Sequence, residues 1–251
     1  MSSFGFWNVK GCNDPLKIKE LRRCILDNNL YLFSILETKV KAANELSHQR
    51  SLLQQWKFLC SYGSNNTRCI WICWDPSRCS VTLLDSNPQW IHCNVSVSQP
   101  SLSFYLTCVY GANEYTERRK LWSFMTLSAM THRNSPWCIA GDFNAIRKPE
   151  DKKGGCTDWT HMDEEFNTCC NRTELEELRS VGFRFTWSNI QTANRILSKL
   201  DRVMVNSKWL EEFTNSEARI LPPGISDHTP CLIHVLEQTK QRKIPFKFFS
   251  C

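Results

Sequence analysis

Residues 137–145, WCIAGDFNA, place a carboxylate and an amide two positions apart, directly after an apolar run. A short apolar run is typical of a buried strand, and Gly141 would break it. Alternate side chains of an extended chain point the same way, so Asp142 and Asn144 would project together from the strand's end, as the groups of a site do. Gly, Asp and Asn are also common turn residues, so a polar turn is an equal alternative for this stretch alone.

Several other apolar segments also end in a polar side chain that could do chemistry. One at a time, each has an ordinary interpretation: Glu37 could cap the following helix, and His228 could be a turn residue before Pro230. Collectively they supply oxygen ligands for a hard cation, an amide, a phenol and an acid–histidine pairing, which metal-assisted attack on a phosphate needs. The set comprises Asn8, Glu37, Thr38, Tyr110, Asp142, Asn144, Asp201, Asp227 and His228.

The segments that carry these residues alternate between strand and helix patterns. A helix is expected to begin near Thr116, whose hydroxyl could cap it, with Leu121, Trp122 and Met125 on one face. One mixed α/β domain is expected up to about residue 238. Strands are predicted at 4–9, 31–38, 56–63, 68–75, 80–85, 90–97, 102–111, 137–142, 183–189, 198–206 and 229–236, and helices at 16–26, 40–53, 161–170 and around Trp209.

Composition limits the class of protein. With 251 residues, 41% hydrophobic and 22% charged, the chain is typical of a soluble globular protein, and it has no apolar run long enough for a transmembrane helix. The first residues do not form a secretory signal, so the 14 cysteines are expected to be reduced intracellular thiols. The absence of a CxxC pair argues against zinc.

The net charge of +6 suits a polyanionic partner, and the densest basic cluster, 240–247, could be a contact or a solvated tail.

The order of the polar motifs resembles a known superfamily. The motifs WN, ET, VYG, GDFN, LDR and SDH occur in this order over nearly the whole chain, as in the endonuclease/exonuclease/phosphatase superfamily, the deoxyribonuclease I-like proteins. The segments between them, including PW before GDFN, FTWSN, KLDR and GISDHTP, resemble the endonuclease domain of plant-type LINE (non-LTR) retrotransposons. The resemblance implies an α+β fold, a four-layer α/β sandwich of two packed mixed β-sheets flanked by helices.

The resemblance also implies a mechanism, in which DNA is nicked to leave 3′-hydroxyl and 5′-phosphate ends. Glu37 would be the principal Mg²⁺ ligand, with Asn8 and Asp227 completing the metal pocket; Mn²⁺ could substitute, and whether one or two ions bind stays open. Asp142 would orient or deprotonate the attacking water. Asn144, Tyr110 and His228 would bind the phosphate, and Asp201 would hold His228. Whether Asp142 or His228 is the base stays open.

Four residues are candidates for contact with DNA: Thr186, Trp187 and Asn189 of the FTWSN segment, and Lys10. Trp187, on an alternating strand, could equally be a core residue. Lys10 lies where abasic-site endonucleases of the superfamily carry an acidic residue, and Ser198 lies where they carry an aromatic wall, so little abasic specificity is expected. The implied partner is DNA, without a membrane; a monomer in the nucleus is expected.

Residues 1–238 are expected to form the superfamily domain, and 239–251 a basic tail. The PFKFF segment of this tail resembles the start of the linker that leads to reverse transcriptase in such elements. The resemblance implies an isolated endonuclease unit, or a fragment of an element, without the polymerase. Two alternatives remain. A phosphomonoesterase of the same superfamily would need a basic cluster near the site, and no such run lies beside SDH or GDFN. A catalytically silent nucleic-acid-binding domain would keep the fold without the reaction.

Overall fold

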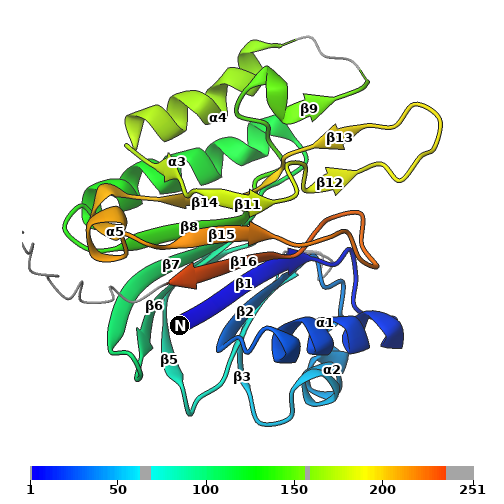
Figure 1. Ribbon diagram of the computed structural model, residues 1–251, viewed down its shortest axis with the longest axis vertical. Coiled ribbons are helices and arrows are strands. Elements are labelled where there is room, and N and C mark those ends of the chain that lie inside the picture. Colours follow the sequence, from blue (N-terminus) through cyan, green and yellow to red (C-terminus); the bar gives the residue numbers. More distant parts are fainter. Residues whose placement is uncertain (1, 63–68, 156–158, 236–251) are drawn as a thin grey trace, which may run out of the picture.

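Two β-sheets packed face to face form the centre of the computed structural model, which describes residues 2–62, 69–155 and 159–235 (Figure 1). One sheet has seven strands in the order β11-β15-β16-β1-β2-β4-β3, and the other has six in the order β10-β14-β8-β7-β6-β5. Both contain parallel and antiparallel pairs, since β1 runs parallel to β2 and antiparallel to β16, while β8 runs parallel to β7 and antiparallel to β14. A small third sheet, β12-β13-β9, projects beside them.

The strands of the seven-stranded sheet are β1 (Ser2–Asn8), β2 (Leu32–Leu36), β3 (Lys57–Tyr62), β4 (Cys69–Trp74), β11 (Ser180–Gly182), β15 (Glu217–Ile220) and β16 (Cys231–Val235). Those of the six-stranded sheet are β5 (Cys79–Asn87), β6 (Trp90–Val97), β7 (Leu102–Tyr110), β8 (Trp137–Asp142), β10 (Glu176–Glu177) and β14 (Asp201–Val205). The small sheet consists of β9 (Lys152–Lys153), β12 (Trp187–Ser188) and β13 (Leu197–Ser198).

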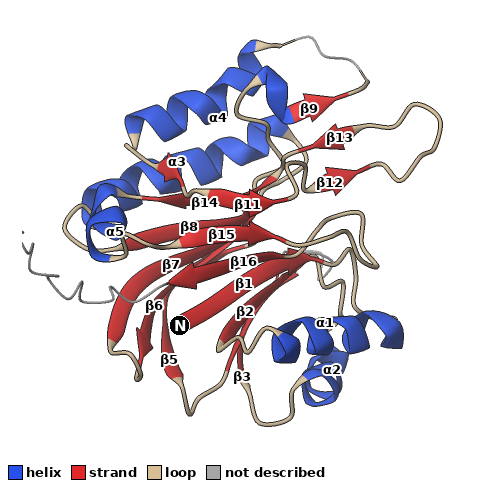
Figure 2. Ribbon diagram, viewed as in Figure 1, coloured by secondary structure: helices blue, strands red, loops and turns tan. Residues whose placement is uncertain are grey.

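Helices cover the outer face of each large sheet (Figure 2). The seven-stranded sheet carries α1 (Pro15–Asp27) and α2 (Glu45–Leu52), whose Leu21 and Leu52 pack with Trp71 of β4. The six-stranded sheet carries α3 (Tyr115–Thr131) and α4 (His161–Arg172), and the short α5 (Ser207–Glu212) follows β14. The resulting helix–sheet–sheet–helix order confirms the predicted four-layer α+β sandwich.

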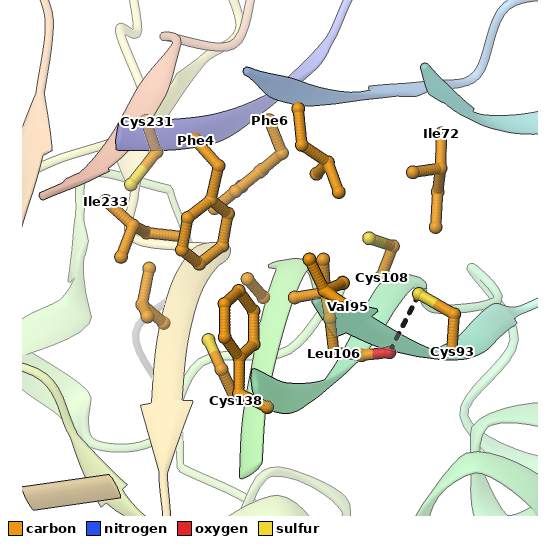
Figure 3. Packing of buried hydrophobic residues seen from close by; sticks show 14 of the residues in the cluster. Phe4, Phe6, Ile72, Cys93, Val95, Leu106, Cys108, Cys138, Cys231 and Ile233 are labelled. Carbon is orange, nitrogen blue, oxygen red and sulfur yellow. Dashed lines mark hydrogen bonds between the residues drawn. The ribbon is translucent and has the colours of Figure 1, made fainter. Parts of the chain in front are cut away.

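The layer between the sheets is the largest apolar core, and it explains why so many strands carry uninterrupted apolar runs. Phe4 of β1, labelled in Figure 3, is part of this layer. It stacks on Phe104 of β7 with ring centroids 5.4 Å apart, joining the two sheets. Thiols fill gaps among the larger side chains there, including Cys93, Cys108 and Cys138. Eleven cysteines of the described part of the chain are free thiols, as the predicted reduced set requires.

Several predicted boundaries were wrong. Helix α3 begins at Tyr115 with Glu114 as its N-cap residue, so Thr116 lies inside the helix and does not cap it. The predicted strands 183–189 and 198–206 are much shorter, because the chain leaves the small sheet after Ser198 and joins the six-stranded sheet only at Asp201. The short strands β9, β10, β11 and β15 were not predicted. The tail at 239–251 lies outside the described residues, and no helix of the described chain is long and apolar enough to cross a membrane.

Candidate active site

The ends of both sheets bring most of the predicted polar residues to one place. In the six-stranded sheet, Tyr110 at the end of β7 is the register partner of Asp142 at the end of β8, and Asp142 is the partner of Asp201 at the start of β14. Three of the predicted side chains therefore occupy one row across three neighbouring strands. In the other sheet, Asn8 ends β1 opposite Leu36, the residue before Glu37.

Asn8 joins the two rows. Its side-chain amide donates to Oδ2 of Asp142 over 2.9 Å, across a sequence separation of 134 residues. Both side chains are buried, with 1% of each residue exposed. Because buried polar groups need partners, this bond fixes how the two sheets meet at the site.

Asp142 is held from a second side by the residue predicted to act with it. The backbone N–H of Asn144 donates to Oδ1 of Asp142 over 2.9 Å, and the Asn144 amide donates to the carbonyl of Gly111 over 2.7 Å. Asn144 has a φ of +47°, a conformation that asparagine tolerates better than most residues. Gly141, which precedes Asp142, has a φ of +145°, and a Cβ there would lie 2.1 Å from the carbonyl oxygen of Val109. Only glycine allows β8 to deliver Asp142 in this position.

His228 lies between two buried carboxylates. Its Nδ1 bonds Oδ2 of Asp201 over 2.8 Å, and its Nε2 lies 3.7 Å from Oδ2 of Asp142. Burial lowers the pKa of His228, but the charges of Asp201 and Asp142 and the bond to Asp201 outweigh it, so the pKa is raised. Burial raises the pKa of Asp142, which the positive charge of His228 opposes only in part. His228 is therefore held as a cationic donor beside a carboxyl group that gains a proton more readily than usual.

Of the residues predicted to bind the metal, Asn8 ends β1, while Glu37 and Asp227 lie on loops. Glu37 has a φ of +55°, and its carboxylate pairs with the Lys39 ammonium over 2.8 Å. The side-chain oxygen of Asn8 accepts from the backbone N–H of Lys10 over 3.0 Å, and the Lys10 ammonium binds Asp227 over 2.7 Å. These side chains offer oxygen atoms only, the donor set that Mg²⁺ prefers, so they fit the expected ion.

A second group could also hold a metal ion. Potential ligand atoms of Asp142, Asp201 and His228 all lie within 4.8 Å of one another. However, these side chains are already bound to each other or to Asn8 and Asn144. Because neighbouring carboxylates favour the cationic form of His228, coordination through Nε2 would first have to release a proton, which weakens this group as a metal site.

The candidates for DNA contact differ in exposure. Thr186 is completely buried, and its hydroxyl accepts the backbone N–H groups of Leu200 and Asp201 over 3.0 and 2.9 Å. It offers no surface to DNA, so the structure assigns it to positioning Asp201. Asn189 is half-buried, and its amide holds the loop after β12 through Gln191, Asn194 and Ile196. The exposed Lys10 and the half-buried Trp187 both reach Asp227.

Two features were missed in the sequence. The guanidinium of Arg202, which is 1% exposed, binds Asp151 and Glu177 and so ties the loop after β8 to β14. The sequence signal that could have revealed this ion pair is an arginine within the otherwise apolar run that follows Asp201. The second feature is a cavity of about 740 Å³ beside Asp227, between the β12–β13 hairpin and the loop before His228; its walls include Phe185, Trp187, Leu197, Pro223, Arg184 and Arg195.

Comparison with known proteins places this arrangement in a family. Residues 5–228 match the model of the "Endonuclease/Exonuclease/phosphatase family". No curated protein sequence matches the chain.

Solved structures share the fold at low identity. The endonuclease domain of TRAS1, a telomere-specific non-LTR retrotransposon, is 13% identical, with a TM-score of 0.70 over 95% of this chain and 100% of that one. An AP endonuclease of Leishmania major is 15% identical, with a TM-score of 0.72 over 92% and 86%. A mannosyl-6-phosphatase of Bacteroides thetaiotaomicron is 10% identical, with a TM-score of 0.61 over 94% and 100%. From the match over residues 5–228 and the fold, the chain belongs to the endonuclease/exonuclease/phosphatase family.

Proposed function

We propose that this protein is a divalent-metal-dependent endonuclease of the retrotransposon type, which nicks DNA to leave 3′-hydroxyl and 5′-phosphate ends. The observation that supports it most is the buried chain of contacts from Asn8 through Asp142 and His228 to Asp201. It places a carboxylate of raised pKa next to a cationic histidine. The names of two similar structures, a retrotransposon endonuclease and an AP endonuclease, support the substrate class.

Glu37 is the first residue that would hold the metal, with the side-chain oxygen of Asn8 as its neighbour. A bound Mg²⁺ would offset negative charge on the phosphate and on the departing 3′ oxygen. The Glu37 carboxylate is 16% exposed, and the pair that it makes with Lys39 involves a half-exposed ammonium that solvent can take over. The carboxylate can therefore exchange a lysine for a metal ion without leaving a buried charge unpaired.

Asp142 and His228 have complementary roles in this proposal. Asp142, aimed by Asn8 and the Asn144 N–H, takes the proton of the attacking water. His228, kept cationic by Asp201, donates to a phosphate oxygen through Nε2, the nitrogen that does not bind Asp201. Asn144 and Tyr110, which adjoin Asp142, complete the phosphate contacts. This division assigns the base to Asp142, a choice that the sequence alone left open.

The experiment is conversion of supercoiled plasmid to open circle by purified protein, with Mg²⁺ or with EDTA. Wild type and the control His48→Ala, which changes a half-buried histidine of α2 away from the site, are expected to nick only with Mg²⁺. Asp142→Ala and His228→Ala are expected to lose on the order of 10²–10⁴-fold in rate, the usual contribution of a positioned acid or base. End-labelled duplexes then identify the chemical ends of the nick.

Two results would change the conclusion. Release of inorganic phosphate from small phosphorylated substrates, without nicking, would identify the phosphomonoesterase. Binding of DNA by folded wild-type protein, without nicking at any Mg²⁺ or Mn²⁺ concentration, would identify the silent binding domain.

A further inference from the structure

The Asp227 carboxylate, predicted as a metal ligand, is already surrounded by hydrogen-bond donors. Its Oδ2 accepts from the Lys10 ammonium over 2.7 Å and from the Trp187 indole over 3.2 Å. Its Oδ1 lies 3.3 Å from the Ser226 hydroxyl, whose single proton has the Asn8 backbone carbonyl as a nearer acceptor, at 2.8 Å. Only 5% of the Asp227 side chain is exposed, so Oδ2 is bound by two donors and the carboxylate is largely shielded from solvent.

Lys10 is held in place by its own backbone. Its φ is +49°, a backbone conformation that is unfavourable for most residues other than glycine and asparagine. The backbone N–H of Lys10 donates to Asn8, and its carbonyl accepts from the Lys17 ammonium over 3.1 Å. The next residue, Gly11, donates its N–H to the Glu37 carbonyl over 2.6 Å. The Lys10 loop is therefore attached to the Glu37 loop, and its left-handed backbone is held by several partners.

The charges around Lys10 reach both predicted metal ligands. The hydrogen bond to Asp227 raises the pKa of Lys10, burial opposes it, and the charges of Asp227 and Glu37 raise it further. Burial tends to raise the pKa of Asp227, but the bond to Lys10 and the charges of His228 and Lys10 leave it lowered. The ammonium and the carboxylate are both ionised, and Glu37 lies within electrostatic reach of the same ammonium.

A divalent ion on Asp227 would have to displace this ammonium or lie a few ångströms from it. Displacement would take the ammonium from a carboxylate of which only 5% is exposed, and coexistence would place two like charges next to each other. Glu37 faces a smaller cost, because its carboxylate is 16% exposed and has Lys39 as its single ion-pair partner among the described residues, whereas Asp227 is also bound by the Trp187 indole. The two carboxylates are thus unequal as metal ligands.

We propose that the site binds one divalent ion, held by Glu37, and that the Lys10 ammonium, fixed on Asp227, takes the place of a second ion. The proposal rests on the proposed function and gives a role to the lysine where related abasic-site enzymes carry an acid. An ammonium has three N–H donors, and the contact with Asp227 uses one, so others can donate to a phosphate oxygen of the substrate. Asp227 then positions Lys10 and does not coordinate the metal.

The test is a titration of the protein with Mn²⁺ in the absence of DNA. Binding is measured by the electron paramagnetic resonance signal of free Mn²⁺ and by calorimetry. Wild type is expected to bind one ion. Asp227→Asn should change its affinity by less than about threefold, while Glu37→Gln should weaken it more than tenfold. Lys10→Met, which frees Asp227, should add a second, weaker ion. Lys153→Met, which removes one exposed ammonium from β9, should remain at one ion.

Other outcomes have distinct meanings. Two ions in wild type, a tenfold loss of affinity in Asp227→Asn, or no second ion in Lys10→Met would each overturn the proposal. Undiminished Mn²⁺ binding by Glu37→Gln, or none by wild type, would instead remove the metal site of the proposed function itself. Thermal unfolding of each variant identifies any that fails to fold, and Lys10→Gln then replaces Lys10→Met as the neutral variant.

Discussion

At the scale of single residues, the pairing of His228 with Asp201 controls the charge of the site. Asp201→Asn removes one of the three carboxylates that raise the pKa of His228, so this pKa should fall and the imidazole should become neutral at a lower pH. If cationic His228 donates to the phosphate, nicking should decline as pH rises through its pKa. In the variant, this alkaline decline should begin at lower pH. An NMR titration of His228 and a pH–rate profile check both shifts; an unchanged alkaline limb would rule out the donor role.

Much of the site at this scale was visible in the sequence, while its contacts were not. The GDFN and SDH motifs led to Asp142, Asn144, Asp227 and His228, because each follows or precedes a recognisable apolar strand. The bond between Asn8 and Asp142 spans 134 residues and exists only because two sheets meet, which no local pattern encodes. The bond of Trp187 to Asp227 is of the same kind, so Trp187 could not be separated from a core residue in advance.

At the scale of elements, the turn between β13 and β14 depends on one buried hydroxyl. Thr186→Val removes the acceptor of the Leu200 and Asp201 N–H groups and leaves two buried donors unpaired. The cost should be about 2–4 kcal/mol in the free energy of unfolding, and Asp201 should lose its position, so nicking should fall as well. Urea unfolding and the plasmid assay measure the two effects.

Two variants separate the hydroxyl from the side chain's volume. Thr186→Ser retains the acceptor and should recover most of both losses, whereas Thr192→Val changes an exposed threonine of the same hairpin and should have little effect. Equal losses in Thr186→Ser and Thr186→Val would show that packing, and not the hydroxyl, sets the turn.

The elements also show where periodicity is informative. Strands 90–97 and 102–110 were predicted closely because long apolar segments run between clear turn residues, and they pair as neighbours β6 and β7. The segment 183–206 was misjudged because its alternation is real but is shared between two sheets. The chain changes partner at Lys199 and Leu200, whose N–H groups donate to the Asp151 carbonyl and the Thr186 hydroxyl of other segments. Such a break is a tertiary effect with no local sequence signal.

At the scale of the whole molecule, a buried histidine pair should make stability depend on pH. Nε2 of His92 lies 2.9 Å from Nε2 of His132, so the two nitrogens share one proton, and Nδ1 of His92 bonds the Thr107 hydroxyl over 2.9 Å. Burial, helped by the nearby His132, lowers the pKa of His92 to about 4, and burial lowers that of His132. The pair joins β6 to the end of α3, so protonation would break a contact between two layers.

The direction in which pH changes the free energy of unfolding follows from the pKa difference between the folded and unfolded states. The pKa of His92 is about 4 in the folded protein and about 6.5 in the unfolded chain. Between these two pH values, the unfolded chain therefore binds more protons than the folded protein. The stabilising contribution of neutral His92 is complete above pH 6.5 and is lost as pH falls toward 4, on the order of 2 kcal/mol for this group.

Urea unfolding at pH 7.5, 5.5 and 4.5 should show this decline in the free energy of unfolding. His92→Gln should flatten it, and His48→Gln, at the half-buried histidine of α2, should leave it unchanged. A decline equally steep in His92→Gln would assign acid sensitivity to other groups, with the carboxylates of the site the first to test.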